Sequence, residues 1–103
     1  MNIMIYVTYP SNEEAKTISK VLIEKKLVAC ANIFPAHETM YWWEGKVEEG
    51  SEIAVIYKTT KENFEAVKDA ILKQHSYDCP CIVALPIDQA YEGFADWIKG
   101  AVL

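Results

Sequence analysis

The sequence predicts an α+β fold: a ferredoxin-like β-α-β-β-α-β sandwich, extended by a long β-hairpin and a C-terminal helix. Apolar, β-branched segments alternate along the chain with segments of helical periodicity in that order. Two split βαβ halves of this kind form a four-stranded antiparallel sheet with two helices on one face. The 103 residues suffice for one hydrophobic core, so a single domain over residues 1–103 is expected.

The first half of the sandwich is predicted from a strand over 3–8, a helix over 12–26 and a strand over 28–34. Ser11 or Asn12 can accept a backbone N–H at the start of the helix, and acidic residues follow them, as the positive end of the helix dipole favours. The apolar positions keep helical spacing and should face the core: Ala15, Ile18, Leu22 and Leu27.

An aromatic β-hairpin should follow Pro35. One arm carries Tyr41, Trp42 and Trp43, Glu44-Gly45 supplies the turn, and the second arm runs from Lys46 towards residue 58. Trp42 should point to the face of the hairpin opposite Tyr41 and Trp43, because strand side chains alternate. An exposed ribbon with this aromatic content is typical of a surface that contacts another subunit.

The second half should contain a helix, a strand and the terminal helix. Thr59 or Thr60 can cap the helix, which ends in the segment 74–78. The fourth strand of the sheet is predicted at 81–85. The terminal helix should have an apolar, mostly aromatic face formed by Tyr91, Phe94, Trp97 and Ile98.

Composition excludes several functional classes. The formal charge is −5, and every one of the ten basic residues is a lysine, so nucleic acid is not an expected partner. No apolar run approaches the roughly 20 residues of a membrane span, and no export signal precedes the first strand. The three cysteines are an odd number, which favours reduced thiols and a cytoplasmic location.

Three residues are candidate metal ligands: His75, Cys79 and Cys81. In an extended chain the two thiols of Cys79-Pro80-Cys81 point the same way and can offer a soft face to Cu(I) or Zn(II). The residues taken alone favour the alternative that both are small buried hydrophobes at the start of a core strand. His75 can serve as a ligand, a proton carrier or a helix C-cap, and a tetrahedral zinc site would require two more ligands than the thiols provide.

No group of residues indicates catalysis. Cys30 lacks an evident neighbouring base, and the chain contains no nucleophile elbow, P-loop or dinucleotide-binding glycine pattern. Lys58 can bind an anion or form an ion pair between subunits. An enzyme is therefore not expected.

Several motifs, in order, resemble the CutA divalent-ion tolerance proteins: the segments 26–33, 41–46, 58–60 and 75–77, then Pro80, Tyr91 and Trp97. The resemblance spans nearly the whole chain. It implies a ferredoxin-like subunit of a homotrimer, with tolerance of divalent metal ions and copper binding as the associated functions and no catalytic activity. Copper or another divalent cation would be held weakly rather than as a tightly bound cofactor.

The chain departs from the family pattern at the implied copper ligands. The usual His-Pro-Tyr is His75-Ser76-Tyr77, and a first-strand cysteine and one of two histidines correspond to Val7 and Gln74. Only His75 is retained. Cys79 and Cys81 are not part of the pattern and are hypothesised to replace the missing ligands.

The matched positions permit a second interpretation, an intersubunit pocket lined by Tyr41, Trp43, Lys58, His75 and Tyr77. Such a pocket can bind a small anionic ligand at the subunit boundary, as the similar nitrogen-regulatory signalling trimers do. The alternative is that these residues only hold the trimer together.

Overall fold

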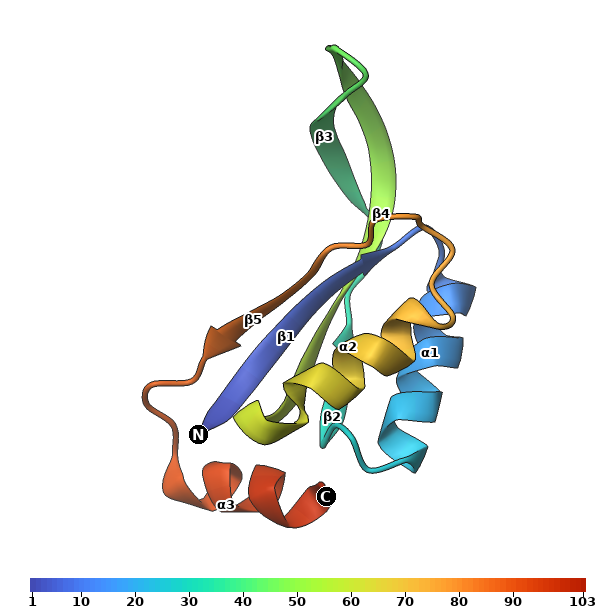
Figure 1. The fold of residues 1–103 in the computed structure, drawn as a ribbon. Coiled ribbons are helices and arrows are strands. Elements are labelled where there is room, and N and C mark those ends of the chain that lie inside the picture. Colours follow the sequence, from blue (N-terminus) through green and yellow to red (C-terminus); the bar gives the residue numbers. More distant parts are fainter.

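A computed structural model describes all residues, 1–103, and shows a body with a hairpin projecting from one end (Figure 1). The longest dimension is 45 Å, against 26 and 23 Å for the other two. The strands are β1 (Asn2–Tyr9), β2 (Cys30–Ile33), β3 (His37–Trp43), β4 (Lys46–Thr60) and β5 (Ile82–Pro86). The helices are α1 (Asn12–Glu24), α2 (Phe64–Leu72) and α3 (Glu92–Ala101), and a short 3₁₀ helix, Lys61–Asn63, precedes α2.

The sheet confirms the ferredoxin-like prediction. Its strands lie in the order β2-β4-β1-β5, all neighbours are antiparallel, and β3 pairs with the outer half of β4. Helices α1 and α2 cover one face, whereas α3 lies at the end of the body away from the hairpin (Figure 1). The chain leaves most of the other sheet face without a covering layer.

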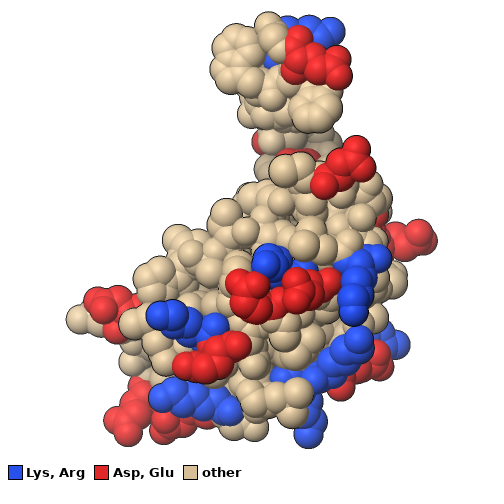
Figure 2. Space-filling model, in the orientation of Figure 1, with Lys and Arg blue, Asp and Glu red and all other residues tan.

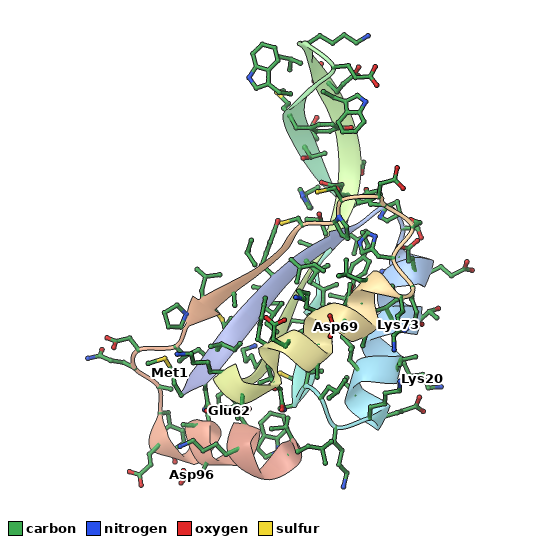
Figure 3. The ribbon with its side chains drawn as sticks, viewed as in Figure 1. Met1, Lys20, Glu62, Asp69, Lys73 and Asp96 are labelled. Atoms are coloured by element: carbon green, nitrogen blue, oxygen red, sulfur yellow. The ribbon has the colours of Figure 1, made fainter.

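The core lies between the sheet and the two helices. Alternate residues of β1 and β4 point towards the helices and are fully buried, among them Ile5, Val7 and Val55. The predicted stripe of α1 meets them, with Ile18 and Leu22 buried. Figure 3 shows charged residues of the helical layer, Lys20 of α1 and Asp69 of α2, on its outer side, where both are exposed. The polar and apolar faces of the helices therefore match the predicted pattern.

The hairpin forms as predicted, and its first arm begins at His37, two residues after Pro35. Glu44 and Gly45 have φ of 50° and 80°, and two positive values are what a type I′ hairpin turn requires. Strand β4 continues without a break through its acidic segment because β3 pairs with it as far as Glu52. Trp42 is 73% exposed and Trp43 is 58% exposed, so the chain itself covers neither indole.

The uncovered face of the sheet is apolar across its centre. One row of neighbouring residues crosses the four strands as Asn32, Ile56, Tyr6 and Val83. Beside Tyr6 and Val83 lie Met4 and Leu85, which also pair directly. Val83 and Leu85 are each 48% exposed. The face therefore presents hydrophobic side chains to whatever lies against it.

The start of α1 agrees with the sequence prediction, whereas the end of α1 and the start of α2 differ from it. Ser11 caps α1 by accepting a hydrogen bond from the Glu14 N–H at 3.2 Å. The helix ends at Glu24 rather than at residue 26. The predicted threonine cap of α2 is wrong: the Thr59 hydroxyl donates to the Leu27 carbonyl at 2.6 Å, and Thr60 makes no side-chain capping bond. The longer-range contact with the segment after α1 takes the hydroxyl that a local cap would have used.

Lys26 explains where α1 stops. It has a φ of 58°, and its N–H donates to Ile23 while the Leu27 N–H donates back to Leu22. These two bonds are those of a Schellman motif, in which the left-handed residue is usually glycine. A lysine in this conformation has an unfavourable contact between its Cβ and the following carbonyl.

We therefore predict that Lys26→Gly raises the free energy of unfolding by about 0.5–1 kcal/mol, after the added flexibility of the unfolded chain is deducted. Urea denaturation at fixed protein concentration measures the change. Lys25→Gly is the matched control, because Lys25 has an ordinary φ of −81° and the same change there should destabilise. Equal destabilisation by both substitutions would contradict the role assigned to Lys26.

None of the three helices combines the length and the hydropathy needed to cross a bilayer. Figure 2 shows lysine and acidic side chains together over the body and at the tip of the hairpin, and acidic side chains without lysines near the junction of hairpin and body. The junction is where the candidate site lies.

Candidate functional site

A cavity of about 640 Å³ lies where the hairpin leaves the body. Its walls come from the end of β1, both arms of the hairpin, and the loop between α2 and β5. Its lining residues are Thr8, Thr39, Tyr41, Trp43, Gly50, Ser51, Glu52, Ser76, Tyr77, Asp78, Cys79 and Cys81. The structure thus brings five residues of the predicted sites, Tyr41, Trp43, Tyr77, Cys79 and Cys81, to one place.

Hydrogen bonds fix the loop that forms one wall. The Ser76 N–H donates to a carboxylate oxygen of Glu14 at 3.0 Å, and the Tyr77 N–H donates to Nδ1 of His75 at 3.1 Å. Nε2 of His75 lies 2.8 Å from the carbonyl oxygen of Thr8. These contacts tie the loop to α1 and β1, so the wall is held from two elements of the body.

His75 has its two ring nitrogens engaged. Nδ1 accepts a backbone N–H and lies 3.5 Å from a carboxylate oxygen of Glu14, whereas Nε2 faces a carbonyl, an arrangement that fits the tautomer with its proton on Nε2. The side chain is fully buried, and its ring stacks on Tyr9 at 4.9 Å between centroids. Neither nitrogen offers a free lone pair to a metal ion. In this structure His75 positions Tyr77 from beneath the cavity and does not line it.

Tyr77 connects the loop to the hairpin. Its hydroxyl donates to Glu52 of β4 at 3.0 Å. Burial raises the pKa of Tyr77 to about 12, and the hydrogen bond and negative charge of Glu52 act in the same direction. Tyr77 therefore remains a donor at neutral pH and holds the Glu52 carboxylate in place beside the cavity.

Cys79 and Cys81 lie in the exposed part of the loop before β5. The alternative that they are buried core residues is therefore wrong, because β5 begins only at Ile82 and the thiols stand outside the sheet. Burial raises the pKa of Cys81, and the charge of Glu52 raises it further. Nowhere in the chain do three or more histidine, cysteine or acidic side chains form a group that could hold a metal ion. The thiol pair therefore supplies two ligands at most.

Lys58 does not belong to the cavity. It lies on the uncovered sheet face, where its ammonium group donates to Oδ1 of Asn32 and lies 4.0 Å from the sulfur of Cys30. Within one chain, the predicted intersubunit pocket is therefore divided. Tyr41, Trp43 and Tyr77 line the cavity, His75 supports it, and Lys58 lies elsewhere.

Sequence reasoning did not identify Glu52 and Asp78 as site residues, although both line the cavity. The acidic run that ends at Glu52 indicates a negatively charged segment in the sequence. Placing the Glu52 carboxylate at the cavity requires the register of β4 against β3, which only the structure gives. The lining contains no lysine, arginine or histidine. Its charge is opposite to the one that an anionic ligand requires.

A chain of buried hydroxyl groups lies behind His75. The hydroxyls of Tyr9 and Tyr57 are 2.5 Å apart, and that of Tyr57 is 2.8 Å from Ser19. Burial raises the pKa of Tyr9, and the neighbouring Tyr57 adds to the effect. Burial also raises the pKa of Tyr57, outweighing the hydrogen bonds with Ser19 and Tyr9 that lower it. Both tyrosines are therefore neutral structural groups within the core.

Comparison with known proteins gives a consistent result. The family model for the CutA1 divalent ion tolerance protein matches residues 3–101. A divalent-cation tolerance protein CutA from Archaeoglobus fulgidus is 50% identical over 102 residues, which cover 99% of both chains. A chloroplastic CutA 1 of Oryza sativa is 38% identical over 97% of this chain and 56% of its own length.

Solved structures agree with the sequence relatives. The Archaeoglobus fulgidus structure, described as a periplasmic divalent cation tolerance protein, has a TM-score of 0.96 at 48% identity, with both chains covered completely. The Thermus thermophilus structure has a TM-score of 0.96 at 38% identity, with 99% of each chain covered. A match over nearly the whole sequence and the whole fold leads to one conclusion: this chain belongs to the CutA1 divalent-ion tolerance family.

Proposed function

We propose that the chain acts in tolerance of divalent metal ions as a homotrimer that binds copper or a similar ion weakly, without catalysing a reaction. The observation that carries the metal proposal is the exposed thiol pair at the cavity, Cys79 and Cys81. Membership of the divalent-ion tolerance family supports the physiological role.

The surface of the single chain supports the trimer. The uncovered sheet face exposes Val83 and Leu85, and the hairpin exposes Trp42 and Trp43. Apolar surface of this extent is characteristic of an interface, since burial in a neighbouring subunit removes it from water. A cyclic assembly can cover both the sheet face and the hairpin of every copy.

The two cysteines support a soft ion. Thiolate sulfur is the ligand that Cu(I) prefers, and two thiolates suffice for a low-coordinate site. The raised pKa of Cys81 keeps its thiol protonated at neutral pH, so the ion must displace a proton. That cost is consistent with weak binding.

We expect Cys79→Ser/Cys81→Ser to reduce the apparent Cu(I) affinity at least tenfold, because both sulfur ligands are lost. An anaerobic titration against a colorimetric Cu(I) chelator measures it. Cys30→Ser is the control, since Cys30 lies apart from the cavity beside Lys58.

The Cu(I) affinity of the wild-type protein should rise with pH, by about tenfold per pH unit for each thiol proton displaced. An unchanged Cu(I) affinity in the variant Cys79→Ser/Cys81→Ser would exclude the thiol pair as the copper ligands.

We further propose that the chain is cytoplasmic. The cysteines are all free, and a reducing compartment keeps free thiols available for an ion.

A second candidate function is a ligand-responsive signalling trimer. The observation in its favour is the cavity itself, whose walls join the hairpin to the body through the hydrogen bond between Tyr77 and Glu52. A ligand bound in this cavity would contact the hairpin and would thereby alter the contacts that the hairpin makes with other subunits. Its negatively charged lining argues against the anionic ligand suggested by the resemblance to nitrogen-regulatory trimers.

A further inference from the structure

We propose that the cavity at the base of the hairpin binds a small organic ammonium ion. Cys79 and Cys81 line the same cavity, but the ammonium ion would be held by other residues of the lining. The proposal does not depend on whether occupancy is signalled to a partner. It rests on three features of the lining: its charge, its aromatic rings and its size.

The charge of the lining is uniformly negative. Glu52 and Asp78 face the cavity, and no basic side chain lines it. Lys46, the one lysine of the hairpin, lies opposite Trp43 and 3.5 Å from Glu48. His75 lies beneath the floor, and an oxygen of Glu14 is 3.5 Å from its Nδ1. A cation entering the cavity therefore meets two carboxylates in a lining that contains no basic side chain.

Three aromatic residues supply the second feature. Tyr41 and Trp43 project from the same face of β3, since they are two residues apart in a strand. Tyr77 adds a third aromatic group from the loop wall. Aromatic rings around a carboxylate are typical of sites that bind organic ammonium ions. The ring faces are electron-rich, and a weakly hydrated cation gives up little hydration free energy on leaving water.

Size and geometry distinguish an organic cation from a bare metal ion. The cavity of about 640 Å³ lies in the range of small-molecule sites. A hard metal ion requires several converging oxygen ligands, and no group of three metal-binding side chains is present. Glu52 is held by the Tyr77 hydroxyl, so its carboxylate is already oriented before a ligand arrives.

The test uses the full chain in its native assembly and choline as the probe. Its neutral isostere, 3,3-dimethyl-1-butanol, has the same shape without the charge. By ligand-observed NMR and calorimetry, choline should bind at least tenfold more tightly than the neutral alcohol, and acetate should not compete. Equal binding of choline and the alcohol, or no binding of choline at millimolar concentration, would overturn the proposal.

Variants locate the site. Glu52→Gln keeps an acceptor for Tyr77 but removes the charge, and it should weaken choline binding about fivefold. Trp43→Leu should weaken it about threefold. Glu49→Gln is the matched control, because Glu49 is exposed on the opposite face of the same hairpin. An equal loss in Glu49→Gln and Glu52→Gln would show general charge attraction and refute a site at the cavity.

One comparison separates this proposal from the copper site. Glu52→Gln removes no sulfur ligand, so it should weaken choline binding without a loss of Cu(I) affinity. Equal losses of choline and Cu(I) binding in Glu52→Gln would show that the change disrupts the whole cavity and would overturn the assignment of Glu52 to the ammonium ion.

Discussion

Val83→Asp should convert the proposed trimer into monomers while the chain remains folded. Val83 is 48% exposed in the single chain, so the aspartate can remain hydrated in a monomer. Val83 lies on the apolar row with Tyr6 and Ile56, and in the proposed trimer a neighbouring subunit would cover this row and desolvate an unpaired carboxylate. Burying such a charge costs several kcal/mol per subunit, enough to dissociate the assembly at micromolar concentration.

Leu72→Asp is the matched control, because Leu72 is 49% exposed and lies at the end of α2, in the helical layer on the other side of the sheet. It introduces the same negative charge at an apolar position of similar exposure, and it should remain trimeric. Sedimentation velocity separates the two results, and circular dichroism checks the fold. A trimeric Val83→Asp protein would show that the sheet face is not the interface.

Alkaline pH should destabilise the protein steeply. Burial raises the pKa of both Tyr9 and Tyr57, so these residues stay protonated in the folded chain above pH 10, where the unfolded chain loses those protons. The stabilisation is complete below about pH 10 and declines as pH rises beyond it. Each tyrosine contributes a slope of up to about 1.4 kcal/mol per pH unit.

Urea denaturation from pH 8 to 11, at constant protein concentration, measures the slope. Tyr9→Phe should reduce it by the contribution of one proton, although its stability at pH 8 is lower because Tyr57 loses a hydrogen-bond partner. Tyr91→Phe should leave the slope as it is, because Tyr91 is 82% exposed and unfolding changes its surroundings little. A wild-type stability independent of pH over this range would contradict the assigned cause.

The sequence was sufficient for the order of the elements because each has its own local signal. The periodicity of α1, the Ser11 cap and the Glu44-Gly45 turn are all set by neighbouring residues, and all three appear in the structure. The cap of α2 was predicted wrongly, because Thr59 bonds to Leu27, a residue far away in sequence. Local patterns cannot show such a competing partner.

The candidate site was predictable only in part for the same reason. Tyr41, Trp43 and Tyr77 do converge, but this depends on a loop held by Glu14 and His75. Whether His75 lines the cavity or lies beneath it depends on contacts that span 67 residues of sequence. The placement of Lys58 follows from strand register, which the sequence alone did not determine.

Native mass spectrometry after anaerobic equilibration with Cu(I) tests the proposed trimer and its copper-binding thiol pair together. We expect a species of three times the 11.7 kDa chain mass with up to one copper ion per chain, and a copper-free trimer for Cys79→Ser/Cys81→Ser. A monomeric wild-type protein, or a trimer that binds the same amount of copper without the two cysteines, would contradict it.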